Sequence, residues 1–161
     1  MKYYFTFFFL IVSPWCFSQV TSVSIDRSNF EKSDFPFKGV RVMTVENSFT
    51  PTEENYYVFS KNERGSNLDK LYIEQFQKKH NEWVVIASEI VSEPNIITSV
   101  WDNRKAIFDA DKDGKADALF IYSKHPKDNV DEQLAVVMVI FWNGQIHHVE
   151  SIADTDYDPD L

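Results

Sequence analysis

Four aspartates and one glycine fall within nine residues of the chain, at a spacing that suits a divalent cation. The carboxylates stand at positions 1, 3, 5 and 9 of the segment 109–117, and Gly114 at position 6 permits a sharp turn. The aspartates are Asp109, Asp111, Asp113 and Asp117. Ca²⁺ takes about six to eight oxygen ligands in flexible geometry, and this spacing can supply several of them. The segment therefore predicts a calcium-binding loop.

We expect the ligands to be the four carboxylates and the main-chain carbonyl of Lys115. Without a cation, four carboxylates this close together would repel one another. An EF-hand would require Glu at position 12, where the chain has Phe120. Mg²⁺ fits less well because it demands octahedral geometry and retains its waters. The alternative is an acidic, solvated turn that binds no metal.

The spacing resembles the Asp-x-Asp-x-Asp-Gly-x-x-Asp calcium loop that joins two strands in FG-GAP and integrin-type β-propeller repeats. All five motif positions match, and the resemblance implies that Asp117 closes the site. The motif occurs once, so it does not predict a propeller built from repeats of this chain.

From about Tyr56 onward, the chain also resembles a secreted family of Bacteroidota associated with surface polysaccharide biosynthesis. The matching segments are 106–114, 120–122, the apolar stretch before Asn143-Gly144, and 157–159. This resemblance implies a link to surface polysaccharide, and a natural chain that continues past Leu161. It supplies no catalytic motif.

Residues 1–18 read as a signal peptide. Lys2 is followed by an apolar stretch over 3–12, which is too short to span a bilayer, and cleavage is expected before Gln19. The alternatives are a buried N-terminal strand and lipid attachment at Cys16. Cleavage would remove the single cysteine, leaving neither a thiol nor a disulfide. We expect an exported protein that is periplasmic, cell-surface or secreted, with no transmembrane span in the mature chain.

The rest of the sequence predicts one all-β domain that positions the loop. Of the 161 residues, 43% are hydrophobic and 16% aromatic, and the formal charge of −9 with scattered basic residues argues against nucleic-acid binding. We expect an antiparallel meander of about seven to nine strands, propeller-blade-like or sandwich-like, with few helices. A calcium-loop β domain at 38–152 would follow an irregular segment at 19–37 and precede an acidic tail at 153–161.

Individual segments sharpen this expectation. The apolar run 134–142 predicts a central strand covered on both faces. Asn143-Gly144 after it predicts a hairpin turn, because both positions favour positive φ. The segment 71–77 reads as a strand, with a helix over 68–78 as the alternative.

Other candidate chemistry is sparse. His147 and His148 are adjacent on an expected strand, so their side chains should point to opposite faces. Paired carboxylates for glycoside hydrolysis would come from Glu53, Glu54, Glu74, Glu89 and Glu93, which read equally well as surface residues. Trp83, Trp101 and Trp142 could form a sugar-stacking platform, although core packing is the simpler interpretation. We assign no catalytic residue and no organic cofactor.

The sequence therefore predicts an exported, non-enzymatic domain that binds one structural Ca²⁺, with a glycan or an envelope protein as its partner. One alternative is a carbohydrate- or protein-binding adhesion module, which predicts an exposed aromatic patch near the loop. The other is a glycan-active enzyme, which predicts two facing carboxylates in a cleft away from the metal.

Overall fold

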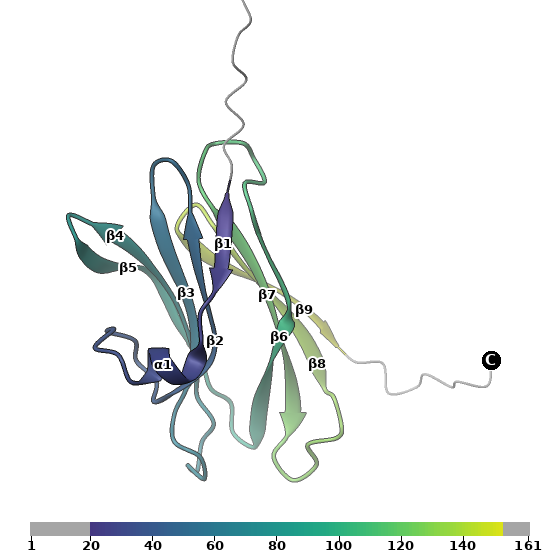
Figure 1. Cartoon of the computed structure of the whole chain (residues 1–161). Helices are drawn as coiled ribbons and strands as arrows, with labels where there is room; N and C mark the ends of the chain where they lie inside the picture. Colours follow the sequence, from purple (N-terminus) through teal and green to yellow (C-terminus); the bar gives the residue numbers. More distant parts are fainter. Residues whose placement is uncertain (1–19, 153–161) are drawn as a thin grey trace, which may run out of the picture.

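The computed structural model describes residues 20–152, which form two antiparallel β-sheets packed face to face (Figure 1). The five-stranded sheet contains β1 (Thr21–Ser24), β2 (Arg41–Phe49), β3 (Glu54–Lys61), β4 (Leu71–Lys79) and β5 (Glu82–Val91). The four-stranded sheet contains β6 (Ile96–Phe108), β7 (Asp117–Pro126), β8 (Ala135–Trp142) and β9 (Gln145–Ile152). Neighbours in each sheet follow chain order, so both are meanders. The predicted all-β class is confirmed, and the arrangement is sandwich-like.

The signal-peptide and acidic-tail predictions fall outside the described residues. Within residues 20–152, no helix has the length and apolar character needed to cross a bilayer.

The main core lies between the two sheets and is built from alternate residues of the central strands. Its fully buried members are Tyr57, Phe59, Leu71, Ile73, Ala118, Phe120, Tyr122, Val137, Val139 and Phe141. The rings of Phe59 and Phe120 approach across the sheets with centroids 4.7 Å apart. Burying each large apolar side chain contributes about 1.5–3 kcal/mol, so this cluster is the main source of attachment between the sheets.

A second cluster covers the outer face of the five-stranded sheet and corrects the expectation that 19–37 is irregular. This segment contains β1, which pairs with β2, and the short helix α1 (Arg27–Glu31). The helix begins because the Asp26 side chain accepts a hydrogen bond from the Asn29 amide at 2.9 Å. Phe30 of α1 is buried against the sheet with Val42, Val45, Val58 and Phe76.

The prediction that 134–142 is covered on both faces is wrong, although β8 does lie between β7 and β9. Burial alternates along β8, so that one face joins the core and the other stays half-exposed. The described residues place no layer over the outer face of the four-stranded sheet (Figure 1). The segment 71–77 lies within a strand, β4, and the turn at Asn143 (φ 50°) and Gly144 (φ 69°) forms as predicted.

Two charged clusters also join the sheets. In the first, the Lys61 ammonium lies 2.7 Å from the Asp69 carboxylate and donates to the Thr98 carbonyl of β6 at 2.7 Å. Burial opposes the charge on Asp69, but hydrogen bonds from Lys61 and Thr98 outweigh it and hold the Asp69 pKa below its ordinary value. This ion pair is largely buried, so the two charges depend on each other.

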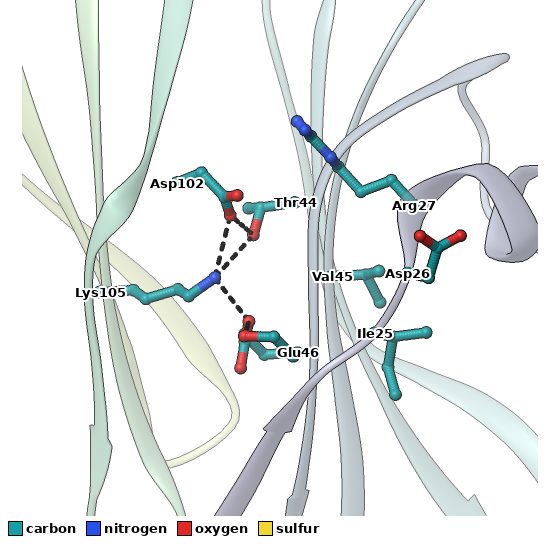
Figure 2. Close-up of a pocket in the computed structure, with 9 residues that line it drawn as sticks. Ile25, Asp26, Arg27, Thr44, Val45, Glu46, Asp102 and Lys105 are labelled. Atoms are coloured by element: carbon teal, nitrogen blue, oxygen red, sulfur yellow. Dashed lines mark hydrogen bonds and ion pairs between the residues drawn. The ribbon is translucent and has the colours of Figure 1, made fainter.

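The second charged cluster lines a small cavity of about 200 Å³ where β1 and β2 meet β6 (Figure 2). Lys105 reaches from β6 to Glu46 at 2.6 Å and to Asp102 at 2.9 Å. Burial alone would lower the Lys105 pKa, but bonding to these two carboxylates raises it. A lysine held protonated in this way is a poor nucleophile, so the cluster is suited to joining β2 to β6.

Candidate metal site

The aspartate loop joins β6 to β7 at one end of the sandwich. Phe108 and Asp117 are paired in the strand register, so the loop between them is closed at its base. Lys112 (φ 62°) and Gly114 (φ 87°) adopt left-handed backbone conformations, which make the loop compact and fit the turn expected at Gly114.

Three of the four predicted carboxylates converge. Asp109, Asp111 and Asp117 each offer one carboxylate oxygen, and these oxygens lie within 4.8 Å of one another. Among residues 20–152, no other set of three or more His, Cys, Asp or Glu side chains comes together in this way. Such a cluster of oxygen donors has the chemistry that a hard cation requires.

Main-chain amides hold the three carboxylates in place. Asp109 accepts from the amides of Asp113 and Gly114, both at 3.1 Å. Asp111 accepts from the Asp113 amide at 3.2 Å, and Asp117 accepts from the Ala110 amide at 2.9 Å. The conformation of the loop backbone therefore orients all three carboxylates.

Asp113 and Lys115 are placed differently from the other three. The Asp113 carboxylate accepts from the Lys115 amide at 2.9 Å and from the Lys115 ammonium at 2.7 Å. These hydrogen bonds lower the Asp113 pKa. Asp113 is therefore paired with Lys115 and is not one of the three carboxylates that converge.

Asp117 is the buried member of the group, with 6% of its surface exposed. Burial raises the pKa of Asp117, and the neighbouring charges of Asp111, Asp113 and Asp109 raise it further, against the effect of the Ala110 amide. The negative charge on Asp117 is thus held in an unfavourable setting, which a bound cation would relieve.

The loop is also bonded to the five-stranded sheet, through residues that sequence reasoning did not connect with it. The Ala116 carbonyl accepts from the Tyr57 hydroxyl at 2.8 Å, and the Ala116 amide donates to the Glu53 carboxylate at 3.1 Å. Tyr57 and Ala116 are 59 positions apart, and no local pattern signals such a pair. Order in the loop is therefore coupled to contact between the sheets.

The three candidate tryptophans do not form one platform. Trp83 packs on Tyr56 in the outer cluster, and the Trp101 indole donates to the Ser123 hydroxyl at 3.0 Å. Trp142 alone borders the loop: it is 45% exposed, and its indole donates to Asp111 at 3.2 Å.

The remaining candidates are scattered. On β9, His148 pairs with Glu89 of β5 at 2.7 Å, whereas the ring of His147 lies near Trp142, with centroids 6.0 Å apart. Glu74 is fully buried, with one carboxylate oxygen accepting from the Lys38 amide at 2.9 Å. Glu54 pairs with Lys78, and Glu93 pairs with Lys124.

Glu53 is the one of these five glutamates that lies beside the loop. Its carboxylate accepts from the Ala116 amide, from the Asn55 side chain at 3.1 Å and from the Gln77 side chain at 2.7 Å. With its oxygens committed to three donors, Glu53 is suited to holding structure rather than transferring protons.

Comparison of the chain with protein-family models, with curated proteins and with solved structures finds no match.

Proposed function

We propose that this chain is an exported, non-enzymatic β domain whose loop 109–117 binds one structural Ca²⁺. The observation that carries the proposal is the convergence of Asp109, Asp111 and Asp117 within 4.8 Å. Asp113 and the Lys115 carbonyl complete the proposed ligand set. Export supports the choice of ion, because extracellular modules bind Ca²⁺ with dissociation constants of about 10⁻⁴–10⁻³ M, and a site of modest affinity is then sufficient.

A structural role for the ion follows from what the loop contacts. Ala116 lies directly before Asp117 and is hydrogen-bonded to Tyr57 of β3 and to Glu53, the residue that precedes β3. An ion that fixes the loop would therefore also hold β7 against the five-stranded sheet. At ten times its dissociation constant, it would stabilise the fold by about 1.4 kcal/mol.

A melting curve with and without chelator tests this proposal. We expect the melting temperature to rise with added CaCl₂ and to return to its starting value with chelator. In an Asp113→Ala variant, the Ca²⁺-dependent shift should shrink. A shift of unchanged size in that variant would show that Asp113 is not a ligand. The absence of any shift in the wild-type protein would contradict the proposal that the loop binds Ca²⁺.

The second candidate is a carbohydrate- or protein-binding adhesion module, and the exposed Trp142 beside Asp111 favours it. This candidate keeps the calcium loop of the first proposal. It differs in that a glycan or a protein would bind to the surface around the loop. The proposed association with surface polysaccharide rests on the family resemblance, and glycan-array screening of the purified protein tests it. A glycan-active enzyme receives less support, because the hydrogen bonds of Glu53 leave it poorly placed for acid–base work.

Export is tested separately. Expressed in a bacterial host, the full chain should be recovered outside the cytoplasm with Gln19 as its first residue. Recovery of the intact N-terminus in the cytoplasm would contradict the proposal.

A further inference from the structure

The inner faces of the sandwich change from apolar to polar at the end that carries the aspartate loop. Along β4, Leu71 and Ile73 belong to the core, and Gln75 and Gln77 follow on the same face. Along β3, Asn55 precedes the core residue Tyr57 in the same alternation. The β4–β5 hairpin diverges from the four-stranded sheet at this end (Figure 1).

A cavity of about 320 Å³ opens there, which we call the polar cleft. It lies between β4, the aspartate loop and the β8–β9 turn. Its polar lining includes Glu53, Gln75, Gln77, Lys79, Lys115 and Asn143. Its volume falls at the lower end of the range of small-ligand sites, about 300–1,000 Å³.

Four described residues carry a buried side-chain polar atom without a hydrogen-bond partner, and Gln75 is the one of them that lines the polar cleft. The residue is 6% exposed, and its Oε1 has no hydrogen-bond partner among the described residues. Its Nε2 makes only a long contact of 3.4 Å to the Asn55 side chain. A buried, unpaired acceptor of this kind destabilises a fold by about 1–3 kcal/mol, and a ligand hydroxyl group that paired with it would recover part of that free energy.

The chemistry of the lining favours an uncharged ligand rich in hydroxyl groups. Two carboxylates, Glu53 and Asp117, balance two ammonium groups, Lys79 and Lys115, so the cleft has no formal excess charge. Side-chain amides supply both hydrogen-bond donors and acceptors, and a ligand hydroxyl group can pair with either kind. Ile86 and Gly144 also line the cleft, and they are close neighbours: a Cβ atom added to Gly144 would lie 3.1 Å from the Cγ2 methyl group of Ile86. Ile86 therefore offers an apolar contact at this point.

We propose that the polar cleft binds one uncharged sugar residue, with the Gln75 carboxamide as its anchoring group. The Oε1 atom is closed off in the ligand-free fold, so the Gln75 side chain would turn toward the cleft on binding, where a ligand hydroxyl would donate to Oε1. This proposal rests on the carbohydrate-binding candidate above and gives it a site. It does not require the calcium ion, although Asp117 contributes to both sites.

Ligand-observed and ¹⁵N-resolved NMR of the purified protein test the proposal. D-glucose, D-galactose, D-mannose and N-acetyl-D-glucosamine serve as probes, each titrated with CaCl₂ and again with chelator. We expect saturable binding of at least one sugar, with shifts at the side-chain amides of Gln75 and Asn143. Binding that survives chelation supports the cleft even if the calcium site fails, which separates the two proposals.

Two variants sharpen the test. Gln75→Met retains side-chain length and removes the carboxamide, and we expect it to weaken binding at least tenfold. Gln133→Met makes the same change in the loop before β8, at the opposite end of that strand, and should leave affinity unchanged. The titration of the wild-type protein tests sugar binding by itself, so the proposal can still be refuted if a variant does not fold.

Three results would overturn the proposal. The first is no saturable binding of any of the four sugars. The second is equal affinity in wild type and a folded Gln75→Met variant. The third is tighter binding of D-glucuronate than of D-glucose, which would show that the cleft selects charge.

Discussion

Replacing Asp117 with Asn should make the protein more stable than wild type without metal and less stable than wild type with Ca²⁺. The substitution removes one charge from the group formed by Asp109, Asp111 and Asp117, whose oxygens lie within 4.8 Å of one another. An Asn side-chain oxygen can still accept from the Ala110 amide, which Asp117 binds at 2.9 Å. The variant therefore relieves repulsion while keeping the loop's main-chain bond.

The size of the effect follows from Coulomb's law. At a separation of about 5 Å and an effective dielectric constant of about 40–80, one pair of like charges repels by about 0.8–1.7 kcal/mol. Asp117 takes part in two such pairs, worth about 2 kcal/mol together. The weaker hydrogen bond to a neutral acceptor returns about 1 kcal/mol of this. The net gain is about 1 kcal/mol, or a rise in melting temperature of about 4 °C for a domain of this size.

Calcium should stabilise the wild-type protein more than the Asp117→Asn variant. At ten times the dissociation constant, the wild-type protein gains about 1.4 kcal/mol, and the variant, without a ligand carboxylate, gains little. Thermal unfolding in chelator should rank the variant above wild type, and unfolding in CaCl₂ should rank it below. Asp131→Asn, the same charge change in the exposed loop before β8, should shift neither curve by more than about 0.5 kcal/mol. A variant less stable than wild type in both conditions would refute the reasoning.

Three further predictions concern the contacts between the sheets. Phe120→Ala should lower the free energy of unfolding by about 3–5 kcal/mol in denaturant titrations, because this fully buried ring would leave a cavity. Asp69→Asn should cost about 3 kcal/mol by leaving Lys61 buried without its partner. Because the Asp69 pKa is lowered in the fold, the wild-type advantage should be complete above about pH 4 and fade as pH falls further, whereas a constant difference would exclude the ion pair as its cause. Lys105→Met should lower the free energy of unfolding by about 2 kcal/mol in the same titrations, because the buried Glu46 would lose its ion-pair partner, and an unchanged value would show that Glu46 does not depend on Lys105.

Local patterns predicted the strands well, because alternation and turn chemistry act over a few residues. The segment 71–77, predicted as a strand, lies within β4, and Asn143-Gly144 predicted the hairpin between β8 and β9. The outer face of β8 was misjudged because an apolar run shows what a strand can bury, and not what lies over it. The half-exposed Met138 is an example.

The division into two sheets could not be predicted, because it depends on which neighbouring strands pair. β5 and β6 are consecutive, yet they belong to different sheets. The sequence also did not predict the irregular pairing of β6 with β7 between Val100 and Lys105. This shift lies beside the cluster in which Lys105 reaches Glu46.

The spacing of the aspartates along the chain was enough to predict part of the candidate metal site. Positions 1, 3 and 9 of the loop, Asp109, Asp111 and Asp117, come together as the motif implies. Asp113 instead pairs with Lys115, whose ammonium lies 2.7 Å from the Asp113 carboxylate. The link from Ala116 to Tyr57 and the position of Gln75 in the polar cleft depend on tertiary packing, for which the sequence carries no local signal.

Calcium titration calorimetry on the purified protein tests the central claim most directly. The account predicts one Ca²⁺ bound per chain with a dissociation constant of about 10⁻⁴–10⁻³ M, and no binding to the Asp117→Asn variant at the same concentrations. The absence of any heat of binding in the wild-type protein, with a melting temperature unchanged by chelator, would contradict it.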